Sequence, residues 1–231
     1  YNMGYSTSFF WDGGVPTLEQ QALAPIENPV EMDLPLDEAV RRLNEHPSYP
    51  ARFREAYGRD PDLFSLTRAL AAFERSFISG NSAYDRYLLG DSSALNSDQK
   101  AGKDIFFSER AECFHCHTGI LFTDFSFQNN GLYADYTDEG RAVITGSPRD
   151  VGKFKVPSLR NVAQTSPYMH DGSIATLEGV LDHYQSGGKG HRNQNPVLRP
   201  LELSQQERRQ VIAFLRSLSD PSFLTDPNHK P

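Results

Sequence analysis

Apolar residues follow a helical repeat in only a few stretches of this chain. Along residues 63–77 they succeed one another at steps of four, three and four, which is the spacing of one helix face. These residues are Leu66, Leu70, Phe73 and Phe77. Residues 204–207 (SQQE) form a capping box, and the helix that it opens carries Val211, Leu215 and Leu218 on one face. Both patterns predict amphipathic helices.

Shorter helices are predicted elsewhere. Residues 17–20 (TLEQ) form another capping box, and Pro25 and Pro29 are expected to end the helix that it starts. Ser97 is the expected cap of a helix that leads into a pair of cysteines. The predicted short helices span residues 37–44, 97–107 and 176–184.

The remaining stretches have no sustained period. Residues 118–155 are rich in Gly, Asp, Asn and Thr and are expected to form a long functional loop, while the last dozen residues contain three prolines and are expected to be an extended tail. Strand signals are few. The sequence therefore predicts a mainly α fold, with a domain boundary near residue 92 that separates residues 1–92 from residues 93–231.

Both cysteines of the chain lie in one short motif, Cys113-Phe114-His115-Cys116-His117. C-x-x-C-H is the attachment signature of a c-type haem, in which each thiol adds to a vinyl group and the adjacent histidine binds the iron. A redox dithiol, a structural disulfide or half of a zinc site are the alternatives. A zinc site needs a second Cys or His pair at ligand spacing, and the sequence has no second C-x-x-C. The motif predicts covalent haem on Cys113 and Cys116, with His117 below the iron.

Composition narrows the class of protein. The 231 residues carry a net charge of −7, which argues against nucleic-acid binding and leaves a basic protein partner open. No apolar run approaches the roughly 20 residues that span a bilayer. The sequence holds no signal peptide, but Tyr1 is not a natural start, so an upstream segment is expected. Haem attachment to C-x-x-C-H usually occurs outside the cytoplasm, which indicates the periplasm.

Several stretches, in order along the chain, resemble the bacterial dihaem cytochrome c peroxidase and MauG family. They are FWDGG at 10–14, LEQQAL at 18–23, PIENPVEM at 25–32, CFHCH at 113–117 with Gly119 and FTD at 122–124, FKVPSLRNV at 154–162, and PYMHDG at 167–172. The resemblance implies two cytochrome c-like haem domains, each with its own C-x-x-C-H. Only the second motif is present here, so the first haem is expected on a missing segment or on another polypeptide, unless it was lost.

In the family the first haem binds peroxide, and the resemblance gives three residues of this chain a place beside it. Glu31 would move a proton between the peroxide oxygens as a general acid–base, with Gln21 as its hydrogen-bonding partner. Pro25 would wall the pocket and keep the iron's sixth position open. The plainer alternative is that Glu31 is a surface or capping carboxylate.

The resemblance places Trp11, the only tryptophan, between the two haems as an electron relay. The alternative is a buried core aromatic. In MauG a surface tryptophan two residues before the haem cysteine passes oxidising equivalents to the protein substrate, whereas this chain has Ala111 there. The exit route should therefore differ. The candidates are Trp11 itself and the tyrosines Tyr84, Tyr87, Tyr133 and Tyr136.

The sixth ligand of the second haem distinguishes a MauG-like protein from a classical peroxidase. Alignment by resemblance puts Tyr184 at the ligand position, as in MauG, where the peroxidases have methionine. Tyrosinate is a hard anionic donor that favours the higher oxidation states of iron, whereas a thioether favours Fe(II). Met169, His170 and His183 are the competing ligands.

The family also holds a calcium ion between the haems. Its backbone ligands match Thr165 and Pro167, and carbonyl oxygens suit this hard cation. Arg160 and the pair His170-Asp171 either bind haem propionates or form a structural ion-pair network.

These features are compatible with three functions. The first is a MauG-like dihaem enzyme that uses hydrogen peroxide to form high-valent iron and oxidises a protein partner, with a tryptophan as one possible target. The second is a dihaem cytochrome c peroxidase that reduces peroxide with electrons from a small cytochrome or cupredoxin. The third is a monohaem electron-transfer module, which needs only Cys113, Cys116, His117 and Tyr184.

Overall fold

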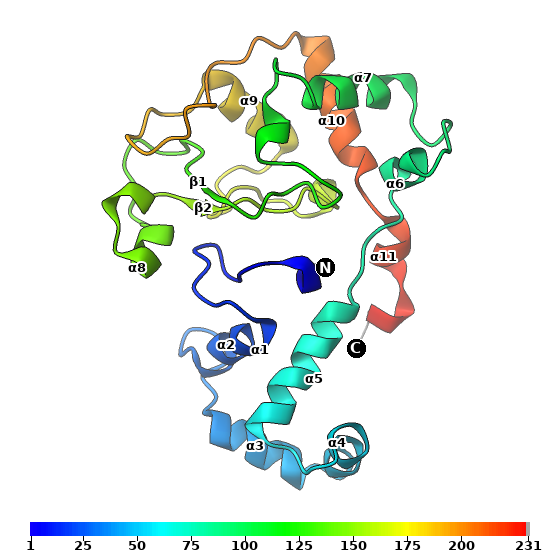
Figure 1. The fold of residues 1–231 in the computed structure, drawn as a ribbon, viewed down its shortest axis with the longest axis vertical. Coiled ribbons are helices and arrows are strands. Elements are labelled where there is room, and N and C mark those ends of the chain that lie inside the picture. The colour runs from blue at the N-terminus through cyan, green and yellow to red at the C-terminus, as the bar shows by residue number, and fades with distance from the viewer. Residues whose placement is uncertain (230–231) are drawn as a thin grey trace. The chain divides into compact units, whose positions relative to one another are not determined.

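The computed structural model describes residues 1–229 and is mainly helical, which confirms the predicted fold class (Figure 1). Its described strands form one two-stranded antiparallel sheet, β1 (Phe127–Gln128) and β2 (Phe154–Lys155), with Phe127 opposite Lys155. Short 3₁₀ turns connect other elements. They are Met3–Tyr5, Cys113–His115, Pro148–Asp150, Val162–Gln164 and Pro227–His229.

The described chain divides into two compact units. The first comprises Tyr1–Phe10 and Gly14–Ile78, and the second comprises Trp11–Gly13 and the chain from Ser79 onward. Helix α6 (Ala83–Leu88), which the predicted boundary at residue 92 assigns to the first part, contributes Tyr84 to the core of the second unit. The division at residue 92 stays a prediction.

The first unit holds five helices around a small core of Phe9, Leu18 and Ala71. Its helices are α1 (Leu18–Gln21), α2 (Leu23–Glu27), α3 (Leu36–Glu45), α4 (Tyr49–Tyr57) and α5 (Leu63–Ser76). The predicted helices at 37–44 and 63–77 are confirmed as α3 and α5. On α5, however, the buried residues include Ala71 and Thr67, and the ring of Phe73 is 52% exposed.

Thr17 caps α1 by accepting a hydrogen bond from the backbone of Gln20. The expectation that Pro25 would end this helix is wrong, because Pro25 lies within the short helix α2. A proline fits the first turn of a helix, where its missing N–H has no intrahelical acceptor.

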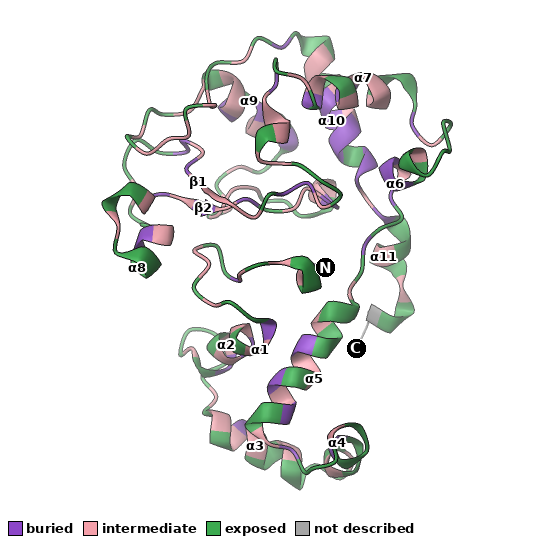
Figure 2. Ribbon diagram, in the orientation of Figure 1, coloured by how far each residue is buried: buried purple, intermediate pink, exposed green. Residues whose placement is uncertain are grey.

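The second unit has an apolar core, to which α10 contributes several of the buried residues that are purple in Figure 2. Besides α6 its helices are α7 (Ser97–Phe106), α8 (Arg141–Thr145), α9 (Leu177–Ser186), α10 (Gln205–Ser217) and α11 (Pro221–Thr225). The predicted capping box of α10 is present, and its three predicted apolar residues, Val211, Leu215 and Leu218, are buried. Asn96, one residue before the predicted Ser97, caps α7. The tail expected to be extended contains α11, which Asp220 caps.

Helices α7 and α10 make the most extensive contact between any two elements of the described chain. Gly102 of α7 is buried at this contact, and a Cβ built there would lie 1.8 Å from the carbonyl oxygen of Gln210 on α10. The helices therefore approach closely because residue 102 has no side chain. The chain runs from the end of α7 towards the two cysteines.

A buried ion pair ties α6 to the segment after β2. The guanidinium of Arg160 donates to both carboxylate oxygens of Asp85 at 2.8 Å, and it also donates to the carbonyl of Ile120 at 2.7 Å. The Arg160 and Asp85 side chains are 5% and 11% exposed. The ion pair that is one of the two predicted roles of Arg160 is therefore present, and propionate binding stays a prediction.

A second buried network closes the unit around Asp220. Its carboxylate accepts hydrogen bonds from the backbone of Gly80 and Asn81 at 2.9 Å, and from Ser222 and Phe223. Burial opposes the charged form of Asp220, but these hydrogen bonds outweigh it and lower the pKa to about 2. This one carboxylate therefore links the backbone at residues 80–81 to the start of α11.

Asp220→Asn is expected to lower the free energy of unfolding by about 2 kcal/mol at pH 7. Because the folded-state pKa lies below the unfolded value of 3.8, the stabilisation is present above about pH 4 and is lost as the pH falls towards 2. Urea unfolding between pH 7 and pH 3 measures it, with Asp135→Asn as a surface control. A difference between wild type and variant that is constant over this range would contradict the account.

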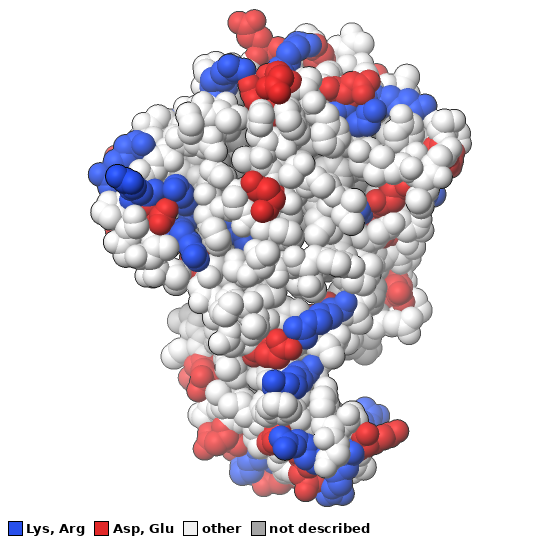
Figure 3. All heavy atoms as spheres, viewed as in Figure 1, with Lys and Arg blue, Asp and Glu red and all other residues white. Residues whose placement is uncertain are grey.

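No helix within residues 1–229 is both long enough and apolar enough to cross a lipid bilayer. On the face that Figure 3 shows, acidic and basic side chains are interspersed within each unit.

Candidate haem site

The cysteine motif lies in a tight turn between α7 and an irregular loop. Cys113 begins a 3₁₀ turn, and the backbone N–H of His117 donates to its carbonyl at 3.0 Å. The carbonyl of Cys116 accepts from the backbone of Asp124 at 2.9 Å. These hydrogen bonds hold the motif in place, so that its side chains together form a wall inside the second unit.

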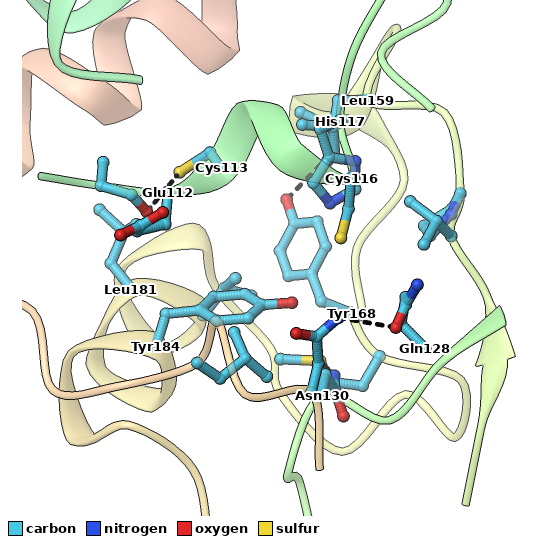
Figure 4. Close-up of a pocket in the computed structure, with 18 of the residues that line it drawn as sticks. Glu112, Cys113, Cys116, His117, Gln128, Asn130, Leu159, Tyr168, Leu181 and Tyr184 are labelled. Atoms are coloured by element: carbon cyan, nitrogen blue, oxygen red, sulfur yellow. Dashed lines mark hydrogen bonds between the residues drawn. The ribbon is translucent and has the colours of Figure 1, made fainter. Parts of the chain in front are cut away.

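Next to this wall is a cavity of about 230 Å³. Cys113, Cys116 and His117 line it, and so does Tyr184 of α9. Most of its other walls are apolar and come from several elements: Phe106, Leu159, Val162, Leu177, Leu181, Val211 and Leu215. In Figure 4 the side chains of Cys116 and Tyr184 point into the same space from different elements. The sequence-predicted attachment and ligand residues of the second haem therefore meet in one cavity.

The hydrogen bonding of His117 suits it to bind a metal through Nε2. Its Nδ1 lies 3.0 Å from the carbonyl oxygen of Phe122, and a carbonyl can only accept, so Nδ1 carries the proton. Burial lowers the pKa of His117, although hydrogen bonds to backbone carbonyls oppose this. A neutral imidazole with a free Nε2 is the form that binds haem iron.

Tyr184 supplies an oxygen to the same cavity. Burial raises the pKa of its phenol to about 12, while a hydrogen bond with the Asn130 side chain acts in the opposite direction. Its environment therefore favours the neutral phenol when no cation is near. A metal cation reverses this preference, because its charge stabilises the anionic form of a bound ligand.

The alternatives to haem find less support in the described residues. The two cysteines are free thiols rather than a disulfide. Burial raises the pKa of Cys113 to about 12 and also raises that of Cys116, which is unlike a reactive dithiol. Within residues 1–229, the one cluster of three metal-ligating side chains is Glu109, Glu112 and His115, which includes neither cysteine. Two thiols and an imidazole beside an apolar cavity, with a phenol that also faces it, fit a c-type haem.

The competing sixth ligands differ in position. His183 is not part of the cavity lining, and its Nε2 is bonded to the carbonyl of Asn130 at 2.9 Å. Met169 and His170 both line the cavity. The sulfur of Met169 accepts a hydrogen bond from the Asn130 amide at 3.2 Å. The choice between Tyr184 and these residues stays a prediction.

Asn130 is a site residue that the sequence analysis missed. It lines the cavity, and its amide contacts Met169 and Tyr184, two of the candidate ligands. Its only sequence signal was its location in residues 118–155, which were expected to form a functional loop. Its neighbours show that this loop does reach the cavity.

Trp11 also lines the cavity although it lies far from the other lining residues in sequence. Its carbonyl accepts a hydrogen bond from the backbone of Lys155 in β2 at 2.8 Å. The residue is 44% exposed, so Trp11 is not a buried core aromatic. Its role as an electron relay stays a prediction.

The three residues predicted for the peroxide site lie in the first unit. Gln21 ends α1, and the carbonyl of Pro25 accepts from the backbone of Met32 at 3.2 Å. Glu31 is exposed, and its carboxylate accepts a hydrogen bond from Asn28 at 2.7 Å, whereas Gln21 was the predicted partner. Pro25 and the turn at Glu31 are thus close together, and their catalytic roles stay predictions.

The structure also describes the predicted calcium ligands, Ala111 and Asp171. Thr165 and Pro167 are exposed, the peptide bond between Ser166 and Pro167 is cis, and the calcium site stays a prediction. Ala111, which stands where MauG has its exit tryptophan, is buried and lines the cavity. Asp171 accepts a hydrogen bond from the hydroxyl of Tyr133.

Comparison with known proteins agrees with this site. Residues 1–93 match the family described as di-haem cytochrome c peroxidase, and residues 99–219 match cytochrome c. The methylamine utilization protein MauG of Methylorubrum extorquens is 41% identical over 233 residues, covering 98% of this chain and 65% of that protein. Cytochrome-c peroxidase IdrP1 of Pseudomonas sp. strain SCT is 33% identical, covering 98% of this chain and 69% of that protein. The chain belongs to the dihaem cytochrome c peroxidase and MauG family.

A solved structure of the family has the same fold. A MauG-like protein associated with microbial copper homeostasis aligns with a TM-score of 0.92 and 33% identity, over 98% of this chain and 76% of that one. The present chain spans 65% of the length of the MauG relative. Its cofactor class is haem c, since the cytochrome c match contains Cys113, Cys116 and His117.

Proposed function

We propose that this chain is part of a MauG-like dihaem oxidoreductase that uses hydrogen peroxide to oxidise a protein partner by long-range electron transfer. The observation that carries the proposal is that Tyr184 faces the cavity shared by Cys113, Cys116 and His117. The identity of 41% to MauG adds support. Tryptophan is one target that such a reaction would oxidise.

The haem, when bound, supplies an iron that changes oxidation state. This chain's residues would attach it through Cys113 and Cys116 and ligate it through His117, whose tautomer is held by Phe122. Tyr184 would provide a hard anionic oxygen, which stabilises the higher oxidation states. These residues would make the second haem a store of oxidising equivalents.

The first unit would supply proton transfer. Glu31 is an exposed carboxylate in a turn that is hydrogen-bonded to Pro25 through Met32, so it is accessible to a peroxide held nearby. A carboxylate can take a proton from one peroxide oxygen and return it to the other. Trp11, on the cavity wall of the second unit, would relay electrons to and from the haem there.

A dihaem cytochrome c peroxidase is the second candidate, and Met169 favours it. Met169 lines the same cavity as Tyr184, and its thioether is a ligand typical of a haem that accepts electrons from a small donor protein. The peroxidase IdrP1 is similar to this chain along 98% of its length. In this case peroxide would be reduced to water with electrons from a small cytochrome or cupredoxin.

Tyr184→Met is expected to raise the midpoint potential of this haem by about 100 mV or more, because a thioether replaces an anionic oxygen. Spectroelectrochemical titration of the full-length holoprotein measures the potential. Tyr168→Phe is the matched control, since Tyr168 lines the cavity and its hydroxyl donates to the carbonyl of Val162 at 3.1 Å. Equal potentials in wild type and Tyr184→Met would remove Tyr184 as the ligand.

The two functions are distinguished by the electron donor. The full-length protein is mixed with peroxide and either a reduced small cytochrome or cupredoxin, or a candidate protein substrate, and peroxide consumption is followed. Faster turnover with the small redox protein would overturn the MauG-like proposal in favour of the peroxidase. One haem per molecule and no peroxide consumption would leave the monohaem electron-transfer module.

The proposal includes a periplasmic location and a calcium ion held by the carbonyls of Thr165 and Pro167. Carbonyl oxygens suit calcium, and both residues are exposed. Metal analysis of the protein before and after washing with a chelator tests whether calcium is bound.

A further inference from the structure

A series of aromatic rings leads from the cavity wall to the protein surface within the second unit. Phe154 and His170 both line the cavity, and their rings are stacked with centroids 3.7 Å apart and planes at 13°. The ring of Tyr136 lies 6.2 Å from that of Phe154 and 6.3 Å from that of His170. Tyr133 follows, with its centroid 5.6 Å from that of Tyr136. Each step is short enough for rapid electron transfer between neighbouring rings.

The last ring of the series has a base at its hydroxyl. Tyr133 is 38% exposed, and its hydroxyl donates a hydrogen bond of 2.6 Å to the carboxylate of Asp171. Burial opposes the charge on Asp171, but hydrogen bonds from Tyr133 and Ser173 outweigh it and lower the pKa to about 2. The carboxylate of Asp171 therefore has a lone pair directed at the phenol.

Among the described residues, no carboxylate accepts a hydrogen bond from the preceding ring, Tyr136. The hydroxyl of Tyr136 donates to the amide oxygen of Asn129 at 3.2 Å and accepts from the backbone N–H of Leu132 at 3.0 Å. An amide oxygen is too weak a base to take a phenolic proton. An electron removed from Tyr136 would therefore be replaced from Tyr133, where proton loss stabilises the oxidised state.

We infer that Tyr133, paired with Asp171, is the surface redox site through which this chain's haem oxidises a protein partner. The inference rests on the proposed function, because the oxidant is hydrogen peroxide acting at the haem centre. One electron passes from Tyr133 through Tyr136 and the Phe154–His170 stack to that centre, and the O–H bond of Tyr133 breaks as its proton moves to Asp171. The neutral tyrosyl then takes an electron from a phenol or indole of the partner, and the proton returns. Two such withdrawals, with the two protons that the oxidised groups of the partner release, balance the reduction of one peroxide to two waters.

The other candidate pair is less suited to this role. The rings of Tyr84 and Tyr87 are 6.4 Å apart, but neither residue lines the cavity. Within the described residues, no carboxylate accepts a hydrogen bond from either hydroxyl, and Tyr84 is buried in the apolar core. Tyr87→Phe is accordingly a matched control that removes one phenol outside the series.

The test uses the full-length holoprotein with ring-deuterated tyrosine, mixed with peroxide and frozen within milliseconds to seconds for electron paramagnetic resonance. A tyrosyl signal narrowed by deuteration is expected in the wild type and in Tyr87→Phe. It should be absent in Tyr133→Phe, and it should form at least about tenfold more slowly in Asp171→Asn, which keeps the shape but loses the base. A wild-type signal that survives in Tyr133→Phe, or that is not narrowed because it belongs to Trp11, would overturn the inference.

Peroxide consumption in the same samples separates this inference from the proposed function. If the wild-type protein does not consume peroxide, the proposed function fails and the inference fails with it. If it consumes peroxide at the same rate in all variants but gives no tyrosyl signal, only the Tyr133 site is refuted.

Discussion

Replacing Asp85 with alanine is expected to lower the free energy of unfolding of the second unit by about 3–5 kcal/mol. The buried guanidinium of Arg160 would then lose the carboxylate to which both of its terminal nitrogens donate. The same change removes the capping box that Asp85 forms with Ser82 at the start of α6. Urea unfolding followed by circular dichroism measures the loss.

Two further variants separate the ion pair from the cap. Ser82→Ala removes the hydroxyl from the capping box, keeps the pair of Asp85 and Arg160, and should cost about 1 kcal/mol. The double variant Asp85→Ala, Arg160→Met removes both charges and should recover much of the loss, because no buried charge is then left unpaired. A loss in Asp85→Ala no larger than that in Ser82→Ala would show that the pair contributes little.

Gly102→Ala is expected to destabilise the second unit by about 1–3 kcal/mol or more, although alanine is normally the better helix former. The added Cβ would lie 1.8 Å from the carbonyl oxygen of Gln210, and a backbone atom cannot rotate away as a side chain does. Helices α7 and α10 would have to separate. Because α7 leads to Cys113, the yield of covalently bound haem should fall as well. Thermal unfolding and the haem content per protein measure the two effects.

Gly80→Ala is the matched control for this substitution. No atom lies within 4 Å of a Cβ built at Gly80, and its backbone N–H, which donates to Asp220, is retained. The change should alter stability by no more than about 0.5 kcal/mol. A stable, fully haem-loaded Gly102→Ala protein would show that the close approach of the helices is not required.

Local signals in the sequence were sufficient for several elements of the fold. The capping box at Ser204 and the spacing of Val211 and Leu215 located α10, because both depend on residues within a few positions of one another. Helices α6 and α11 were missed because they are only six and five residues long, too short for a periodic pattern. The cap of α7 is one residue away from its predicted place, which is the usual uncertainty at helix ends.

For the candidate site too, contiguous motifs could be predicted from the sequence, whereas contacts between residues far apart in the chain could not. Cys113, Cys116 and His117 could be found because the haem motif is contiguous. Tyr184 was found through a resemblance, and the structure places it at the same cavity. Asn130 and the bond between Tyr133 and Asp171 join residues far apart in the chain, and no pattern in a single sequence specifies such pairs.

The haem cavity is completed by a residue from near the beginning of the chain. Trp11 lines it, and Arg141 donates to the carbonyl oxygens of Asp12 and Gly13 at 2.8 and 3.1 Å, so this short strip is part of the second unit. A cytochrome fragment excised at Ser79 would therefore lack one wall of its own cofactor site. Two gene fragments divided between Gly13 and Ser79 would retain that wall only if their products reassembled. Recombination between relatives of this family should accordingly exchange residues 11–13 together with the cytochrome part.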